Sequence, residues 1–182
     1  MGEVKAKAKI LKAVLSALFT GLAVVLAPWL WFPVLGSKAY PGQHLVNAVA
    51  GVLLGPWWAS LVAMVTGVIR MSWGIGTIYS MPGGIPGALV VGLMYDALKK
   101  SRWKRYARFA ALTEPIGTVI IGGTLALFLV APAIGDVKTM AKPLLALWSG
   151  WSLSSVPGSI LGFIIVEALE RMSITREQLF GE

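Results

Sequence analysis

Polar side chains that could hold a small ligand lie close together at Gln43, His44 and Asn47, between two strongly apolar stretches of the chain. Where the surroundings are lipid, such groups usually mark the place at which something polar is bound. His44 and Asn47 are three residues apart, so a helix would place both on one face, with Gln43 beside them. The alternative is that they join neighbouring helices, because a buried polar side chain in a helix bundle must find a partner.

Two tryptophans, Trp148 and Trp151, could hold an aromatic ring. They are three residues apart, which puts them on one face of a helix, and hydroxyl side chains follow from Ser152 onwards. Such a face offers a flat surface for stacking and hydroxyls for hydrogen bonds. Simple helix packing is the alternative for this pair.

Ionisable side chains inside apolar stretches are further candidates for the site. Arg70 would lie near the outer end of its helix, where it could extend to lipid headgroups or reach into a cavity. Glu114 would lie about 9 Å deeper than Arg108, at 1.5 Å per residue. It could pair with a helix terminus or a cytoplasmic cation, accept a hydrogen bond from a ligand, or be linked to conformational change. Tyr79 belongs to a glycine-rich loop that could fold tightly over a bound molecule.

Catalysis and metal binding fit the sequence poorly. The chain has no cysteine and one histidine, which argues against a thiolate or histidine-rich metal centre, and no cofactor is expected. An enzyme that uses His44 and Glu114 as acid and base is an alternative, but their predicted depths place them towards opposite membrane faces. A stand-alone channel or secondary transporter would be expected to show an internal repeat or discontinuous helices, and neither is clear.

The composition indicates an integral membrane protein. Hydrophobic residues make up 57% of the 182 residues and charged residues 13%, and the mean hydropathy is +0.76. We expect one all-α membrane domain over residues 1–182, whose first apolar stretch is a retained helix because no small-residue cleavage site follows it. Six transmembrane helices are predicted, at residues 10–27, 44–54, 57–73, 85–98, 109–130 and 144–169.

Lysine and arginine predict the orientation of these helices, because positively charged loops stay on the cytoplasmic side. With the N-terminus inside, twelve of the sixteen fall in cytoplasmic segments, so both termini are expected in the cytoplasm. The net charge of +8 is then explained by topology and acidic lipid headgroups, without nucleic acid. The outer loops at 28–43, 74–84 and 131–143 would form a lid over an outward-facing cavity.

Small residues recur every fourth position at Ala13, Ala17 and Gly21 of the first predicted helix. This spacing is typical of places where two membrane helices approach closely. The second helix could belong to this chain or to a different membrane protein that docks here.

Three runs of the sequence together resemble the ThiW family: residues 40–48 (YPGQHLVNA), 51–56 (GVLLGP) and 81–88 (MPGGIPGA). The likeness extends from the first helix through residues 113–118 (TEPIGT) into the sixth, which is nearly the whole chain. ThiW proteins are substrate-binding S components of energy-coupling factor (ECF) transporters.

The resemblance implies the six-helix S-component fold and uptake of a thiamine precursor across the plasma membrane of a prokaryote. Hydroxyethylthiazole is the expected cargo, with thiamine or another vitamin precursor as the alternative. The implied partners are a transmembrane coupling subunit, which would dock on Ala13 and Ala17, and two ATPase subunits, since the sequence contains no nucleotide-binding loop. A cationic ligand would call for acidic groups near the outer cavity, and Asp136 is the only acid in the outer half. This favours the thiazole over thiamine. The candidate stacking and hydrogen-bonding side chains fit a small, uncharged aromatic heterocycle better than a phosphorylated or cationic ligand.

Overall fold

The computed structural model describes residues 2–34 and 37–181, and nearly all of them are helical. The principal helices are α1 (Gly2–Leu26), α2 (Pro41–Leu54), α3 (Pro56–Ser72), α4 (Ser80–Lys99) and α8 (Leu144–Arg171). Two short helices, α7 (Val137–Met140) and α9 (Arg176–Phe180), precede and follow α8. Strands β1 (Phe32–Val34) and β2 (Ser37–Ala39) form an antiparallel hairpin between α1 and α2, with Phe32 opposite Ala39.

Proline and glycine set the boundary between α2 and α3. Each of the two helices begins with a proline, Pro41 and Pro56, whose missing N–H costs nothing at a first helical position. Only Gly55 separates them, and its φ of +86° is a conformation that residues with a Cβ rarely adopt. The chain therefore reverses direction within a single residue.

The fifth predicted helix differs most from the structure. Instead of one α-helix over 109–130, the chain forms the 3₁₀ helix η1 (Lys104–Thr113), then the π-helical segments η2 (Ile116–Gly122) and η3 (Ala126–Val130). The short α-helices α5 (Gly123–Leu125) and α6 (Ala131–Ile134) separate and end these segments. Pro115 interrupts the helical hydrogen bonds between η1 and η2, because it has no N–H to donate. The predicted 85–98 helix also differs, since α4 begins at Ser80.

Four helical stretches of the described residues are long and apolar enough to cross a membrane. They are Lys5–Leu26, Ser80–Lys99, Ile116–Ile134 and Leu144–Arg171. α2 and α3 have 14 and 17 residues and are shorter than the roughly 20 that a lipid-exposed span requires. Twelve residues of α2 are buried, so neighbouring helices surround it instead of lipid. The two further spans, and the side on which the termini lie, stay predictions.

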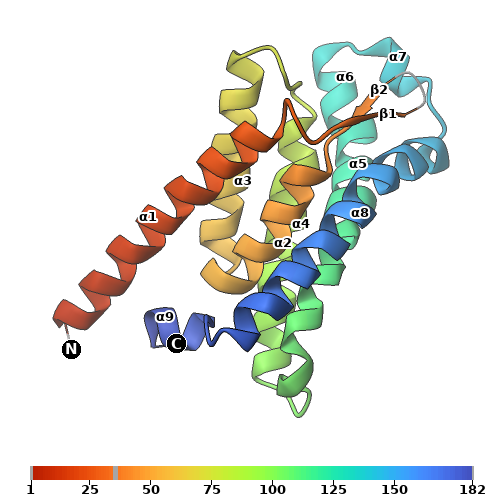
Figure 1. The fold of residues 1–182 in the computed structure, drawn as a ribbon. Helices are drawn as coiled ribbons and strands as arrows, with labels where there is room; N and C mark the ends of the chain where they lie inside the picture. Colours follow the sequence, from red (N-terminus) through yellow and green to blue (C-terminus); the bar gives the residue numbers. More distant parts are fainter. Residues whose placement is uncertain (1, 35–36, 182) are drawn as a thin grey trace.

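α2 is the central helix of the bundle, in contact with α1, α3, α4, α8 and η1 (Figure 1). Its buried Val46, Ala50 and Leu54 pack in one apolar cluster with Ala59 and Val62 of α3. Both chain termini lie at one end of the bundle, which we call the terminal end. The β1–β2 hairpin and α7 lie at the other, which we call the hairpin end.

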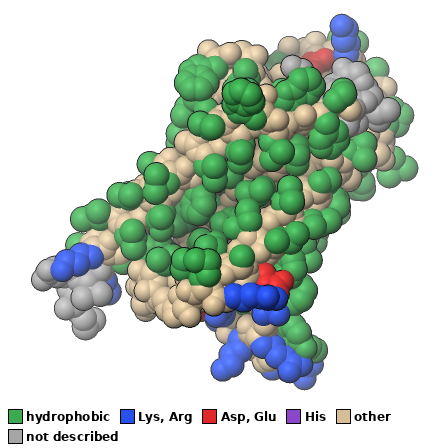
Figure 2. Space-filling model, in the orientation of Figure 1, with side chains coloured by type: hydrophobic (Ala, Val, Ile, Leu, Met, Phe, Trp, Pro, Cys, Tyr) green, Lys and Arg blue, Asp and Glu red, His purple; other side chains and the backbone are tan. Residues whose placement is uncertain are grey.

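Charged and apolar side chains are separated along the bundle. Figure 2 shows lysine and arginine side chains gathered mainly near the terminal end, with hydrophobic side chains covering the faces of the helices above them. The exposed apolar residues include Leu18 of α1, Phe128 of η3 and Ile164 of α8. A bundle that exposes such side chains along its length is suited to lipid surroundings.

Candidate functional site

A cavity of about 890 Å³ opens at the hairpin end. Its wall is formed by the start of α2, the end of α3, the loop that leads into α4, and the first turns of α8. Five of the nine predicted site residues line it: Gln43, His44, Arg70, Tyr79 and Trp151. The structure thus brings residues from four separate segments to one cavity.

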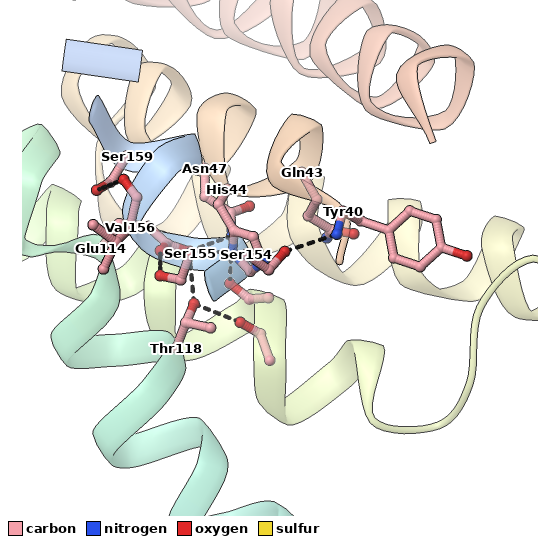
Figure 3. A network of polar contacts seen from close by, with 12 residues as sticks. Tyr40, Gln43, His44, Asn47, Glu114, Thr118, Ser154, Ser155, Val156 and Ser159 are labelled. Atoms are coloured by element: carbon pink, nitrogen blue, oxygen red, sulfur yellow. Dashed lines mark hydrogen bonds and ion pairs between the residues drawn. The ribbon is translucent and has the colours of Figure 1, made fainter. Parts of the chain in front are cut away.

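Behind the cavity wall lies a fully buried carboxylate, Glu114, at the junction of η1 and η2. Its Oε1 accepts hydrogen bonds from His44 Nδ1 at 2.8 Å, Asn47 Nδ2 at 3.1 Å and Thr118 Oγ1 at 2.6 Å. Its Oε2 accepts one from the hydroxyl of Ser155. Figure 3 shows these side chains converging on Glu114 from α2, η2 and α8. Since a carboxylate only accepts hydrogen bonds, four donors suit its ionised form.

The contact between His44 and Glu114 corrects the predicted depths, which placed the two towards opposite membrane faces. The residues before Glu114 form a 3₁₀ helix, which rises about 2.0 Å per residue instead of 1.5 Å. Six residues after Arg108, the chain therefore reaches deeper than an α-helix would. Predicted depth therefore no longer argues against His44 and Glu114 as an acid–base pair. Glu114 is nevertheless fully buried and is not among the residues that line the cavity.

A buried arginine forms a second feature of the wall. Arg70 is 4% exposed and donates from Nη1 to Oε1 of Gln43, which is 5% exposed. Its guanidinium carbon lies 4.4 Å from the centre of the Tyr40 ring, as in a cation–π contact. Arg70 thus points into the bundle and does not extend to lipid headgroups. Among the described residues, neither Nε2 of Gln43 nor Nε of Arg70 has a hydrogen-bond partner.

A hydrogen bond at the hairpin end joins the loop before α4 to α7. The Tyr79 hydroxyl donates to Oδ2 of Asp136 at 2.6 Å, and Thr139 donates to the same carboxylate from its hydroxyl and its backbone N–H. The Tyr79 bond, followed by those of Thr139, lowers the pKa of Asp136 to about 2. Asp136 is the N-cap of α7, and the Asp-x-x-Thr spacing was the sequence signal that could have identified this role.

The four other predicted site residues lie outside the cavity lining. Asn47 and Glu114 bond each other behind His44, and Asn47 also donates to the carbonyl of Gly84 at 3.2 Å. Trp148 lies against Gly123. The hydroxyl of Ser152 donates to the Trp148 carbonyl one turn earlier in α8, at 2.8 Å.

Sequence reasoning missed several residues of the wall. Tyr40, Thr118, Lys142 and Ser154 all line the cavity. The Ser154 hydroxyl accepts a hydrogen bond from the Tyr40 backbone N–H at 2.8 Å, which joins α8 to the start of α2. Serines that follow Trp151 were noted, but the choice among them depends on helix rotation, which sequence alone does not fix. Within residues 2–34 and 37–181, no group of three or more metal-ligating side chains is present.

The predicted docking residues lie in a separate groove. Ala13, Ala17 and Gly21 line a mainly apolar hollow of about 580 Å³ between α1 and α3. All three are exposed, and a Cβ added at Gly21 would meet no atom within 4 Å. These small residues therefore do not serve as a tight helix contact within this chain.

Comparison with known proteins agrees with the helical, apolar character of the chain. No curated protein matches it significantly, and neither does any solved structure. The family model described as thiamine-precursor transporter protein (ThiW) matches residues 13–172, which include the cavity, the Glu114 cluster and the α1 groove. The chain therefore belongs to the ThiW family of thiamine-precursor transporter proteins.

Proposed function

We propose that this chain is the substrate-capture subunit of an ECF-type importer and that it binds hydroxyethylthiazole in the cavity at the hairpin end. The observation that carries the proposal is the cavity lining, in which an indole ring and paired polar side chains face one space of about 890 Å³. Small-molecule sites are commonly cavities of about 300–1,000 Å³ with few polar groups.

The lining offers both a stacking surface and complementary hydrogen-bonding groups. Trp151 supplies the indole ring against which a thiazole ring stacks. Because Glu114 accepts from Nδ1 of His44, neutral His44 carries its proton on Nδ1 and has an acceptor at Nε2. Nε2 of Gln43 is a donor without a described partner. The ligand hydroxyl would donate to His44, and the ring nitrogen would accept from Gln43.

Charge favours the thiazole precursor over thiamine. Arg70 and Lys142 are among the residues that line the cavity, and none of the described lining residues is acidic. Thiamine carries a positive ring whose nitrogen is fully substituted, so it would be repelled and would leave the Gln43 donor unpaired.

The distribution of charge supports an outward-facing cavity. Lysine and arginine gather mainly near the terminal end (Figure 2), and such an end faces the cytoplasm under the positive-inside rule. The hairpin end and its cavity would then face outwards from the plasma membrane of a prokaryote. The lid would consist of the segments that surround the opening, including the loop that carries Tyr79.

The energy for uptake would come from partner subunits. The sequence has no nucleotide-binding loop, so two ATPase subunits and a transmembrane coupling subunit would complete the importer. The groove with Ala13, Ala17 and Gly21 supports docking of the coupling subunit at α1, because exposed small residues let another helix approach closely.

The test is a titration of the purified protein with hydroxyethylthiazole, and separately with thiamine, followed by tryptophan fluorescence. Saturable quenching by the thiazole at much lower concentration supports the proposal. A preference for thiamine would support the role in transport but would replace hydroxyethylthiazole with thiamine as the ligand. A lack of response to both, with calorimetry also showing no heat of binding, would refute the assignment of this cavity.

A further inference from the structure

Arg70 is a buried cation that has no acidic partner among the described residues. It is 4% exposed, and its two close contacts, the Gln43 side-chain oxygen and the Tyr40 ring, are both uncharged. A buried charge without a counter-ion is costly, because the desolvation that burial causes is not offset by an opposite charge. Arg70 nevertheless lines the cavity, where a ligand could supply the opposite charge.

The neighbouring donors point to the same chemistry. Nε2 of Gln43 and Nε of Arg70 are both buried without a described hydrogen-bond partner, and the two side chains are joined through Oε1 of Gln43. This bond holds Gln43 with its oxygen towards Arg70, which leaves the amide N–H groups to donate elsewhere. A guanidinium beside an amide donor suits a group that only accepts hydrogen bonds.

The acids nearest to the cavity are already engaged. Glu114 lies behind His44 and accepts hydrogen bonds from four side chains. Asp136 accepts from Tyr79 and Thr139. Among the described residues of the lining, the charged side chains are Arg70 and a second cation, Lys142. The negative charges of Glu114 and Asp136 lie behind the wall, so a ligand inside the cavity meets cations at its surface.

We propose that Arg70 and Gln43 form an anion subsite, and that the preferred cargo is a thiazole precursor whose hydroxyethyl group carries a phosphate ester. This inference rests on the proposed function and replaces the uncharged cargo, which the sequence favoured, with its phosphate ester. The ring stacks on Trp151, and the phosphate oxygens accept from Arg70 and from Nε2 of Gln43. The phosphate ester replaces the ligand hydroxyl, so the ligand no longer donates a hydrogen bond to His44 and instead accepts hydrogen bonds from Arg70.

The first test compares hydroxyethylthiazole with its phosphate monoester by calorimetry at pH 8, where the phosphate is a dianion. We expect the ester to bind about ten- to hundredfold more tightly, as for a charge-assisted pair. Inorganic phosphate should compete with the ester more strongly than with the alcohol. Equal or weaker binding of the ester would overturn the anion subsite while leaving the proposed function intact. Absence of binding by both ligands would instead refute the proposed function.

Variants test whether Arg70 is responsible. In Arg70→Gln the ratio of the two affinities should fall towards one, and in Arg70→Lys it should stay above that of Arg70→Gln. Lys138→Gln removes the same charge from α7, outside the cavity lining, and should leave the ratio unchanged. A folded Arg70→Gln protein with the original ratio would show that Arg70 only joins α3 to α2. If Arg70→Gln does not fold, the ester-to-alcohol ratio and the phosphate competition of the unmodified protein decide the matter.

Discussion

Nδ1 of His44 lies 2.8 Å from Oε1 of Glu114, although the two residues are 70 positions apart in the sequence. His44 lines the cavity, whereas Glu114 is fully buried behind it. The pair therefore connects the ligand-facing wall to a carboxylate that also holds Asn47, Thr118 and Ser155. This cluster sets the orientation of the His44 ring, because the hydrogen bond that one ring nitrogen makes determines how the other nitrogen is presented.

Replacing Glu114 with Gln should destabilise the protein by about 1–3 kcal/mol, because buried donors that bond the carboxylate lose an acceptor. The amide would also direct an N–H group at neighbouring donors. The measurement is the thermal midpoint of the purified protein in detergent. Glu167→Gln is a suitable control, because among the described residues Glu167 forms a surface ion pair with the exposed Arg171 one turn away, and its loss should change the midpoint little. Equal midpoints for the two variants would contradict the structural role of Glu114.

Trp151 and Trp148 should respond differently to ligand. Trp151 lines the cavity, whereas Trp148 lies outside the lining and packs on Gly123. Trp151→Phe should therefore remove most of the ligand-induced change in tryptophan fluorescence and weaken binding. Trp148→Phe, three residues away in the same helix, should retain both. Calorimetry separates a loss of signal from a loss of affinity, and the reverse pattern would exchange the roles of the two rings.

Gly122 should not tolerate a side chain. A Cβ at this position would overlap the carbonyl oxygen of Pro82, so the segment that contains Gly122 and α4 pack with backbone against backbone. Gly122→Ala should cost about 1–3 kcal/mol or more, as overpacking does. Gly21→Ala is the control, since no atom lies within 4 Å of its added Cβ. Thermal midpoints that fall equally in both variants would contradict the close helix approach.

The Tyr79–Asp136 contact should depend on pH only in strong acid. The pKa of Asp136 is lowered from 3.8 to about 2, so its contribution to stability is complete above about pH 4 and is lost as the pH falls through about 2. The difference in thermal midpoint between the unmodified protein and Asp136→Asn should therefore be constant above about pH 4 and shrink below it. In a Tyr79→Phe background the difference should be smaller throughout. A difference that disappears already near pH 5 would contradict the lowered pKa.

Enlarging the small residues of α1 should affect assembly and not ligand binding. Ala17→Leu fills the groove between α1 and α3, which should reduce co-purification with a coupling subunit and its ATPases while hydroxyethylthiazole binding is retained. Val14→Leu also introduces a leucine on an exposed part of α1, outside the groove, and serves as control. Undiminished co-purification of Ala17→Leu would remove this groove from the docking surface.

Sequence reasoning identified local features of the fold better than contacts between distant segments. The spacing of His44 and Asn47 predicted a shared helix face, and both side chains do bond Glu114. The depth of Glu114 was wrong because no pattern in residues 104–113 signals a 3₁₀ helix, and winding sets the rise per residue. The sequence likewise did not determine the direction of the Arg70 side chain, since a long side chain near a helix end can extend to lipid headgroups or turn into the bundle. Such outcomes depend on tertiary packing.

Arg176 connects the C-terminal helix α9 to the rest of the bundle. Its Nη1 donates to Asp96 of α4 at 2.5 Å, and its guanidinium lies against Gly55 at the reversal between α2 and α3. α9 lies at the terminal end, opposite the hairpin end (Figure 1), where the cavity opens. The protein could therefore be immobilised on a sensor surface through a tag that follows α9, with ligand access left unobstructed.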